Sequence, residues 1–170
     1  MDKVKQLAQY TAVCSPDFSL YPEMPLPVQE FQVFKNRWCG AHWQTLGLHV
    51  FPTVTWGDER SYSFCFAGIK KHSSVVVSTV GCRTSPNEFL RGYNRMLEVI
   101  HPETIICYGT PFTDMEGNII SFPYATFRKE ASFRRQRWGS TIPNPAGISS
   151  ETTGKRTMDT ACLSKAWSRF

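Results

Sequence analysis

The sequence predicts an α/β domain in which a small, mainly parallel sheet, either an open sheet or a partial barrel, is covered by helices. Apolar runs rich in β-branched residues alternate with helical or turn-like segments along the chain, and this alternation is typical of parallel strands. The chain has 170 residues, whereas a complete eight-stranded barrel needs about 200 or more. Four or five strands therefore fit the length better than eight.

The first half of the chain contains two expected strands joined by a long helix. A short helix at residues 3–10 leads into a strand at residues 11–14. From about Pro25 the apolar residues recur every three or four positions, which predicts a helix with an apolar stripe made of Val28, Phe31, Phe34, Trp38 and Ala41. The second strand, residues 49–55, contains Pro52, which removes a ladder donor and predicts a bulge or a position near an edge.

The second half adds a helical turn, three strands and a long helix. In chain order the expected elements are residues 61–66, 73–80, 86–100, 104–108 and 119–122. Ser85 and Glu88, with Pro86 between them at the first helical position, fit a capping box at the start of the long helix.

Charge divides the chain into an expected α/β domain, residues 1–127, and a basic tail, residues 128–170. The first part holds 10 Lys and Arg against 11 Asp and Glu, and the second holds 9 against 3, so the tail carries all of the net charge of +5. A basic appendage is typical of contact with polyanions. We expect a short helix at residues 128–138 and a disordered or extended linker at residues 140–160. The predicted nucleic-acid contacts are Arg128, Lys129, Arg134, Arg135, Arg137 and Trp138.

Several functional classes are not supported by any pattern in the sequence. No run approaches the roughly 18 apolar residues that cross a bilayer, and the first residues lack the apolar core of a secretory signal, so we expect a cytoplasmic protein without a membrane partner. The six cysteines form neither a C-x-x-C pair nor a zinc-finger pattern. The glycine-rich phosphate loops, the H-E-x-x-H motif and the G-x-S-x-G motif are also missing.

Polar residues that follow the expected strands identify a candidate site. Because parallel strands end at one edge of a sheet, we expect these side chains to gather there: Asp17, Trp56, Asp58, Glu59, Arg60, Ser78, Thr79, Cys82 and Tyr108. The carboxylates Asp17, Asp58 and Glu59 can bind a divalent metal or work as an acid–base pair. Arg60 can hold an anionic substrate or neutralise the acids. The alternative is structural: Asp17 as a turn residue, and residues 58–60 as a solvated loop that caps the next turn.

Several motifs, taken together in this order, resemble an uncharacterised bacterial and phage family, domain of unknown function 4417. They are Ser15–Tyr21, Lys35–Trp38, Trp43–Gln44, Pro52–Ser61, Phe64–Phe66, Ser78–Gly81 and Ile105–Gly109. The resemblance covers about residues 11–122 and implies a mobile-element origin, but it carries no established activity. It adds Arg37 and Gln44 to the pocket candidates Trp56, Ser78 and Tyr108. Family members commonly have more chain before residue 15, which implies one or two further strands there and leaves room for a role in binding alone.

Three functions follow as hypotheses. The leading one is a phage-type α/β protein that acts in nucleic-acid transactions through its basic tail and a polar pocket. The second is a metal-dependent or acid–base hydrolase that uses Asp17, Asp58 and Glu59, with a divalent metal as the possible cofactor. The third is an inhibitor that binds a host protein complex.

Overall fold

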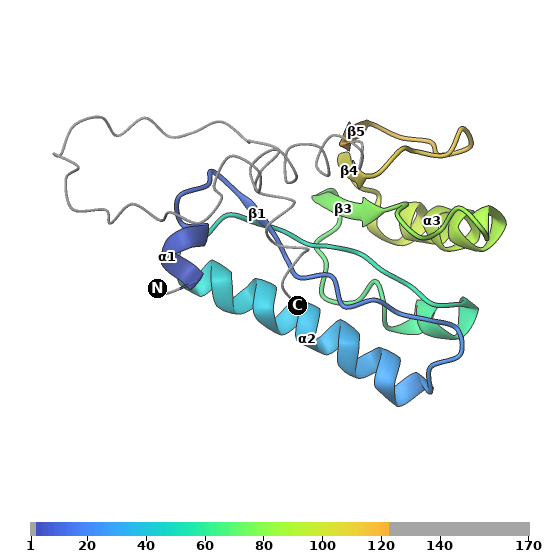
Figure 1. The fold of residues 1–170 in the computed structure, drawn as a ribbon, viewed down its shortest axis with the longest axis horizontal. Helices are drawn as coiled ribbons and strands as arrows, with labels where there is room; N and C mark the ends of the chain where they lie inside the picture. Colours follow the sequence, from blue (N-terminus) through green and yellow to red (C-terminus); the bar gives the residue numbers. More distant parts are fainter. Residues whose placement is uncertain (1–2, 123–170) are drawn as a thin grey trace, which may run out of the picture.

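The computed structural model describes residues 3–122 and has the α/β architecture that the sequence predicts (Figure 1). The predicted basic helix, the linker and the nucleic-acid contacts from Arg128 to Trp138 lie outside the described residues. None of the helices described is long and apolar enough to cross a membrane. In chain order the elements are α1 (Lys3–Leu7), β1 (Val13–Cys14), α2 (Leu26–Thr45), β2 (Val50–Phe51), the 3-10 helix η1 (Glu59–Ser63), β3 (Ser74–Ser78), α3 (Pro86–Ile100), β4 (Thr104–Tyr108) and β5 (Ile119–Phe122).

The strands are all parallel, and each lies next to its neighbour in sequence. β1 pairs with β2, and β3, β4 and β5 form a second parallel set. A parallel bridge between Thr53 and Val76 joins the two sets. The resulting order, β1-β2-β3-β4-β5, resembles a segment of a barrel, because a doubly wound sheet reverses its strand order part way.

Pro52 explains why β2 is shorter than the predicted strand 49–55. It has no N–H to donate, but its carbonyl accepts a hydrogen bond from the backbone N–H of Val76 (2.9 Å). The N–H of Val54 then donates to the carbonyl of Val76 (2.8 Å). The chain therefore pairs with β1 before Pro52 and with β3 after it.

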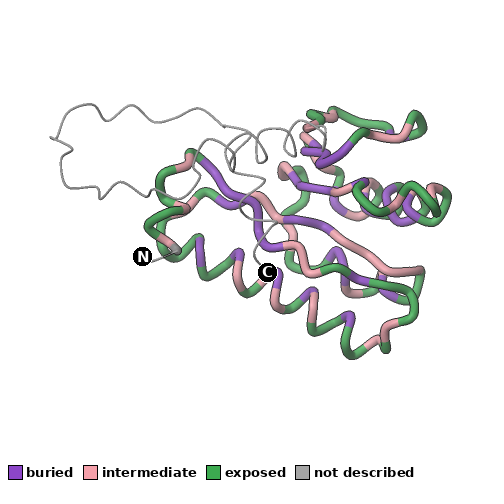
Figure 2. The backbone as a smooth tube through the Cα atoms, in the orientation of Figure 1, coloured by how far each residue is buried: buried purple, intermediate pink, exposed green. Residues whose placement is uncertain are grey.

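The helices of the described chain all pack on one face of the sheet (Figures 1 and 2). On that face Val75, Val77 and Ile105 pack with Tyr93 and Met96 of α3 in the main core. Near the other end of the sheet, side chains from α1, α2, β1 and β2 form a smaller cluster. The opposite face carries a separate cluster of buried residues, Cys14, Val76, Ile106 and Tyr108, with Phe51 and Phe122 beside it.

Helix α2 forms where the sequence predicts it, but its apolar stripe points away from the sheet. The residues that α2 buries are Gln29, Val33, Asn36, Gly40 and Trp43. The exposed fractions of Phe31, Phe34 and Trp38 are 57%, 58% and 57%. The periodicity therefore identified the helix correctly, while its most aromatic side lies in solvent.

A polar junction sets this orientation of α2. Ser15, directly after β1, donates from its hydroxyl to Asn36 Oδ1 (3.1 Å) and accepts from the backbone N–H of Thr53 (2.8 Å). Thr53 Oγ1 donates to the Ser15 carbonyl (2.6 Å), and Asn36 Nδ2 donates to the carbonyl of Pro16. Buried polar groups need such partners, since each group left unpaired costs about 1–3 kcal/mol. The junction thus turns the Asn36 side of α2 toward β1 and β2.

The predicted capping box at the start of α3 does not form. Ser85 is the N-cap residue, but its side chain makes no capping hydrogen bond. Its backbone has φ −136° and ψ 60°, so the local chain direction differs from the extended conformation usual at an N-cap. Ser85 and Glu88 instead line a pocket.

We predict that Gly92→Ala destabilises the protein. A Cβ at Gly92 would lie 2.2 Å from the indole Nε1 of Trp56, so Trp56 would have to move, at a cost of about 1–3 kcal/mol. Without that clash, alanine would stabilise the middle of a helix by roughly 0.5–1 kcal/mol. Gly40→Ala in α2 is the control, because its Cβ would lie 3.4 Å from Ser15 Cβ, an ordinary contact. Chemical denaturation measures both variants, and equal stabilities for the two would contradict the prediction.

Candidate binding pocket

A pocket of about 470 Å³ lies at the carboxyl ends of β1, β2 and β3. The loops that follow these strands and the first turn of α3 form its wall, as expected where parallel strands end. The lining residues are Asp17, Ser19, Leu20, Tyr21, Pro22, Glu23, Val54, Thr55, Trp56, Gly57, Ser78, Val80, Gly81, Cys82, Thr84, Ser85, Glu88 and Phe89. The side-by-side parallel strands on which the predicted site depends are therefore present.

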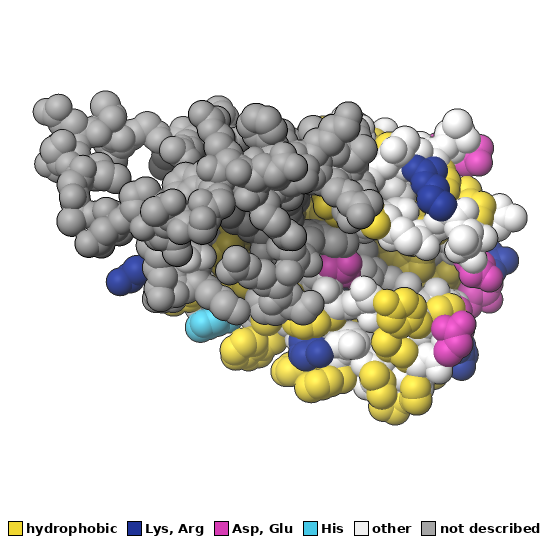
Figure 3. Space-filling view, in the orientation of Figure 1, with side chains coloured by type: hydrophobic (Ala, Val, Ile, Leu, Met, Phe, Trp, Pro, Cys, Tyr) yellow, Lys and Arg dark blue, Asp and Glu magenta, His cyan; other side chains and the backbone are white. Residues whose placement is uncertain are grey.

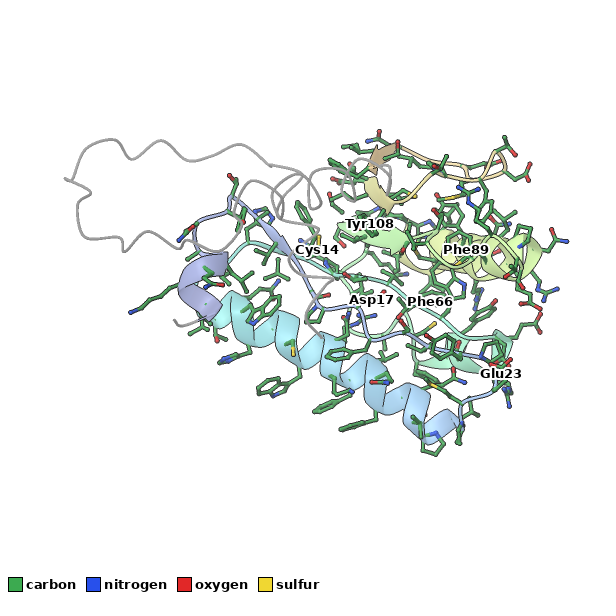
Figure 4. The ribbon with its side chains drawn as sticks, viewed as in Figure 1. Cys14, Asp17, Glu23, Phe66, Phe89 and Tyr108 are labelled. Atoms are coloured by element: carbon green, nitrogen blue, oxygen red, sulfur yellow. The ribbon has the colours of Figure 1, made fainter. Side chains whose placement is uncertain are left out.

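Asp17 is the most unusual group in this pocket. Its Oδ1 is buried and has no hydrogen-bond partner in the described part of the chain. Burial raises the pKa of Asp17 from 3.8 to about 6, because removal from water disfavours the charged carboxylate. The junction at Ser15 and Pro16 holds the backbone just before Asp17, so the carboxyl group is fixed where it faces an open cavity (Figure 4).

The pocket is acidic and partly aromatic. Asp17, Glu23 and Glu88 contribute carboxyl groups, and none of the lining residues within the described chain is a Lys or Arg. Aromatic surface comes from Tyr21, Trp56 and Phe89; the rings of Trp56 and Phe89 lie 5.1 Å apart, centroid to centroid. The wall thus offers hydrogen-bond acceptors and flat apolar faces, and it disfavours an anionic ligand.

The thiol of Cys82 also lies in this pocket. Burial raises the pKa of Cys82, and the nearby negative charge of Asp17 raises it further. A thiol with a raised pKa stays protonated near neutral pH and is a weak nucleophile. The five cysteines of the described residues are all free thiols.

The acidic loop that the sequence singled out packs beside the pocket, and its charged side chains do not line it. Asp58 is the N-cap of η1, and its Oδ1 accepts from the backbone N–H of Arg60 (3.0 Å). Arg60 Nη2 lies 2.7 Å from Asp58 Oδ2, and this hydrogen-bonded pair lowers the pKa of Asp58. The same nitrogen of Arg60 donates to the carbonyl of Pro22 (2.7 Å). These contacts match the alternative interpretation of residues 58–60 as a capping loop.

The structure does not gather the predicted carboxylates into one cluster. Glu59 is 76% exposed, and its carboxylate lies 4.0 Å from the Nε of Arg91. Within residues 3–122 no group of three or more His, Cys, Asp or Glu side chains is placed to hold a metal ion. Of the four residues predicted to be catalytic, Asp17 alone lines the pocket.

The predicted pocket residues divide in the same way. Trp56 and Ser78 line the pocket. Arg37 instead donates to the backbone carbonyls of Thr53 (3.1 Å), Cys65 (2.7 Å) and Ala67 (3.0 Å). Burial lowers the pKa of Arg37 to about 10, which leaves it charged at neutral pH.

The other two predicted pocket residues lie elsewhere. Gln44 is exposed near the end of α2, and Tyr108 is buried in the cluster on the opposite face of the sheet. For Tyr108 a position near a strand end, and for Gln44 a place in a family motif, were therefore not enough to place the residue in the pocket.

Sequence reasoning named Asp17 in the loop after β1 but missed the other lining residues of that loop, and it missed the start of α3 as a pocket wall. Tyr21, Glu23, Ser85 and Glu88 all line the cavity. A signal was available, because residues 15–24 and 79–85 are the connections that follow two predicted parallel strands, and such connections carry ligand contacts in α/β folds.

We predict that the unfolding free energy decreases as the pH rises from about 4 to above 6. A carboxyl group with a raised folded-state pKa binds its proton more tightly in the folded protein, so its contribution is complete below pH 3.8 and is lost as the pH passes about 6. The loss is about 2–3 kcal/mol. Asp17→Asn should remove it, and the exposed Asp114→Asn should not. Urea denaturation at pH 4.5 and 7.5 tests this, and the same pH dependence in wild type and Asp17→Asn would contradict it.

Comparison with known proteins identifies the family. The profile described as "Domain of unknown function (DUF4417)" matches residues 1–125. The "Gene 1 protein" of Mycobacterium phage L5 is 38% identical over 112 residues, 64% of this chain and 48% of that protein. The "Gene 1 protein" of Mycobacterium phage D29 is 37% identical over 101 residues, 58% of this chain and 37% of that protein. The chain thus spans half or less of the length of these relatives, and no solved structure matches it. The matched residues cover the whole described fold, and the chain belongs to the DUF4417 family.

Proposed function

We propose that this protein acts in nucleic-acid transactions and that two parts of the chain divide the ligand between them. The basic segment at residues 128–138 holds phosphates, and the Asp17 pocket receives a nucleobase. The observation that carries the proposal is the composition of the pocket, which combines a buried carboxyl group lacking a hydrogen-bond partner in the described chain with aromatic walls and, among the described lining residues, no Lys or Arg.

The pocket chemistry supports a base better than a phosphate. Carboxylates accept hydrogen bonds from amino groups such as N4 of cytosine, and aromatic side chains stack on bases that have left a duplex. A volume of about 470 Å³ lies within the range of small-molecule sites, about 300–1,000 Å³. The carboxyl groups of Asp17, Glu23 and Glu88 disfavour a phosphate inside the cavity, and the cations Arg60 and Arg83 lie beside the described lining rather than in it. We therefore assign the phosphates to the basic segment.

The sequence of the basic segment and the relatives supply the second support. Five Lys and Arg residues alternate with Phe127, Phe133 and Trp138 between residues 127 and 138, which combines charge for phosphates with faces for stacking. The similarity to proteins of two mycobacteriophages fits a phage setting, in which replication, packaging and defence all involve nucleic acid.

We predict that free nucleosides with an amino group bind the pocket. Cytidine, adenosine or guanosine should bind more tightly than uridine or thymidine, and each should bind more tightly than its own monophosphate because the pocket is acidic. Asp17→Asn should weaken binding about tenfold or more, since a hydrogen bond to a charged group contributes about 1.5–3 kcal/mol. Chemical-shift titration of the full chain measures these affinities.

Asp114→Asn is the matched control for that titration, because Asp114 is exposed in the loop between β4 and β5 and does not line the pocket. Tighter binding of the monophosphates, or equal binding by wild type and Asp17→Asn, would contradict the assignment of the pocket. Neither result bears on the proposed role of the basic segment, which the salt dependence below tests.

We predict that the basic segment sets the salt dependence of oligonucleotide binding. Replacing Arg134, Arg135 and Arg137 together by Ala should reduce the slope of log affinity against log salt by about 2 for a single strand, since each phosphate contact contributes about 0.7. Replacing the exposed Lys70 and Lys71 by Ala is the control and should leave the slope unchanged. Fluorescence anisotropy at several salt concentrations measures the slope, and equal slopes for wild type and the triple variant would refute this role.

A second candidate function is acid–base catalysis in the same pocket, and the observation that favours it is the pKa of Asp17. A carboxyl group with a pKa of about 6 can accept or donate a proton near neutral pH. Such a hydrolase would rest on Asp17, because Asp58 and Glu59 do not line the pocket. Recovery of the nucleoside or oligonucleotide after incubation separates the two: unchanged ligand supports binding, and a product that Asp17→Asn does not form supports an enzyme. Inhibition of a host complex stays a prediction from the sequence.

A further inference from the structure

Helix α2 exposes the side on which its large apolar residues lie. Val28, Phe31, Phe34 and Trp38, here called the aromatic stripe, are 43%, 57%, 58% and 57% exposed. Their spacing of three and four residues places them along one side of the helix. The opposite side, with Gln29 and Asn36 among its buried residues, packs against the domain. Figure 4 shows side chains that project from α2 away from the sheet.

Rings of the stripe form two stacked pairs. The rings of Phe31 and Phe34 are stacked with centroids 6.2 Å apart, and Trp38 stacks on His42 at 5.3 Å. Figure 3 shows hydrophobic side chains gathered along the edge of the molecule that α2 forms. An aromatic side chain has about 150–250 Å² of surface, so the three large rings leave roughly 350 Å² exposed. That area lies within the range of the largest apolar patch on a typical monomer, about 300–600 Å², and such a patch is often functional.

The charges on α2 argue against a highly charged partner. Lys35 lies beside the stripe, and its ammonium group lies over the rings of Phe18 (4.4 Å) and Phe31 (5.2 Å). Glu30 is exposed on the neighbouring side of the helix. With Lys35 as the cation beside the stripe and Glu30 as the neighbouring acid, neither a nucleic acid nor a basic peptide has the opposite charges it needs for binding. The surface matches another apolar helix face best.

We propose that the protein forms a dimer in which the aromatic stripe of α2 packs against the same stripe of a second copy. Such an interface is isologous, which means that the same patch of both copies meets and must be complementary to itself. An apolar stripe meets this requirement because apolar side chains can pack against one another. With Val28 and with Leu46, which follows the end of α2 and is 47% exposed, each copy offers at most roughly 500 Å². Two copies bury at most about 1,000 Å², the area at which a specific interface becomes plausible, before any rim contacts are added.

The dimer leaves the candidate pocket open. No residue of α2 lines that cavity, whose walls come from residues 17–23, 54–57 and 78–89. Dimerisation is therefore independent of the proposed function, and each can fail without the other.

The test is the mass of the full chain in solution, measured by sedimentation equilibrium from low to high micromolar concentration. Wild type should reach twice the mass of the chain. Phe34→Glu combined with Trp38→Glu should raise the dissociation constant about 100-fold or more, because central aromatic residues dominate such interfaces. Phe34→Ala combined with Trp38→Ala should also weaken the dimer. Because alanine is a good helix former, this variant tests the interface without disturbing α2.

Ile120→Glu is the control, since Ile120 is also exposed and apolar, 49%, but lies on β5. It should leave the dissociation constant unchanged, and circular dichroism should show that every variant is folded. If wild type is monomeric at all concentrations, the proposal is wrong, and something other than a second copy must cover the stripe. A dimer that both double variants leave as tight as wild type would overturn it as well.

Discussion

The structure depends on a polar junction that is buried between α2 and the ends of β1 and β2. The hydroxyl of Ser15 accepts from Thr53 and donates to Asn36, and Asn36 in turn binds the carbonyl of Pro16. Arg37 extends the junction to the chain after η1 by donating to the carbonyl of Cys65. Each of these groups is removed from water, so the loss of one partner leaves others unpaired. The junction therefore behaves as a unit and allows one arrangement of helix and strands.

Two surfaces of the protein follow from that arrangement. Because the carbonyl of Pro16 is held by Asn36, the next residue, Asp17, enters the pocket at a fixed place. Because Asn36, with Gln29 and Gly40, occupies the buried side of α2, Phe31, Phe34 and Trp38 lie on the other side. A buried polar junction thus determines both the position of an unusual carboxyl group and the exposure of an apolar stripe.

The sequence predicted what depends on local patterns and on strand direction. The runs at residues 73–80 and 104–108 contain β3 and β4 nearly in full, and the parallel arrangement correctly placed Asp17, Trp56, Ser78 and Cys82 at one cavity. The rotation of α2 was not predictable, since a periodic stripe shows that a helix is amphipathic but not which side its neighbours cover. The role of Asp58 was ambiguous for a similar reason, because a carboxylate that follows a strand can either line a site or cap the next helix. In the structure it is a cap, and it pairs with Arg60 two positions further on.

Charge is distributed unevenly between the two parts of the chain. Residues 1–127 carry a balance of −1 and residues 128–170 a balance of +6. Three acids of the first part line the pocket, and its described lining residues include no Lys or Arg. In the proposed function, attraction to a polyanion comes from the basic part and selection among ligands from the acidic pocket. Pairing through α2 would place two basic segments in one particle, and linked binding sites raise the effective concentration for one strand without any new contact. Affinity and selectivity could then change separately in this family, because different residues determine each.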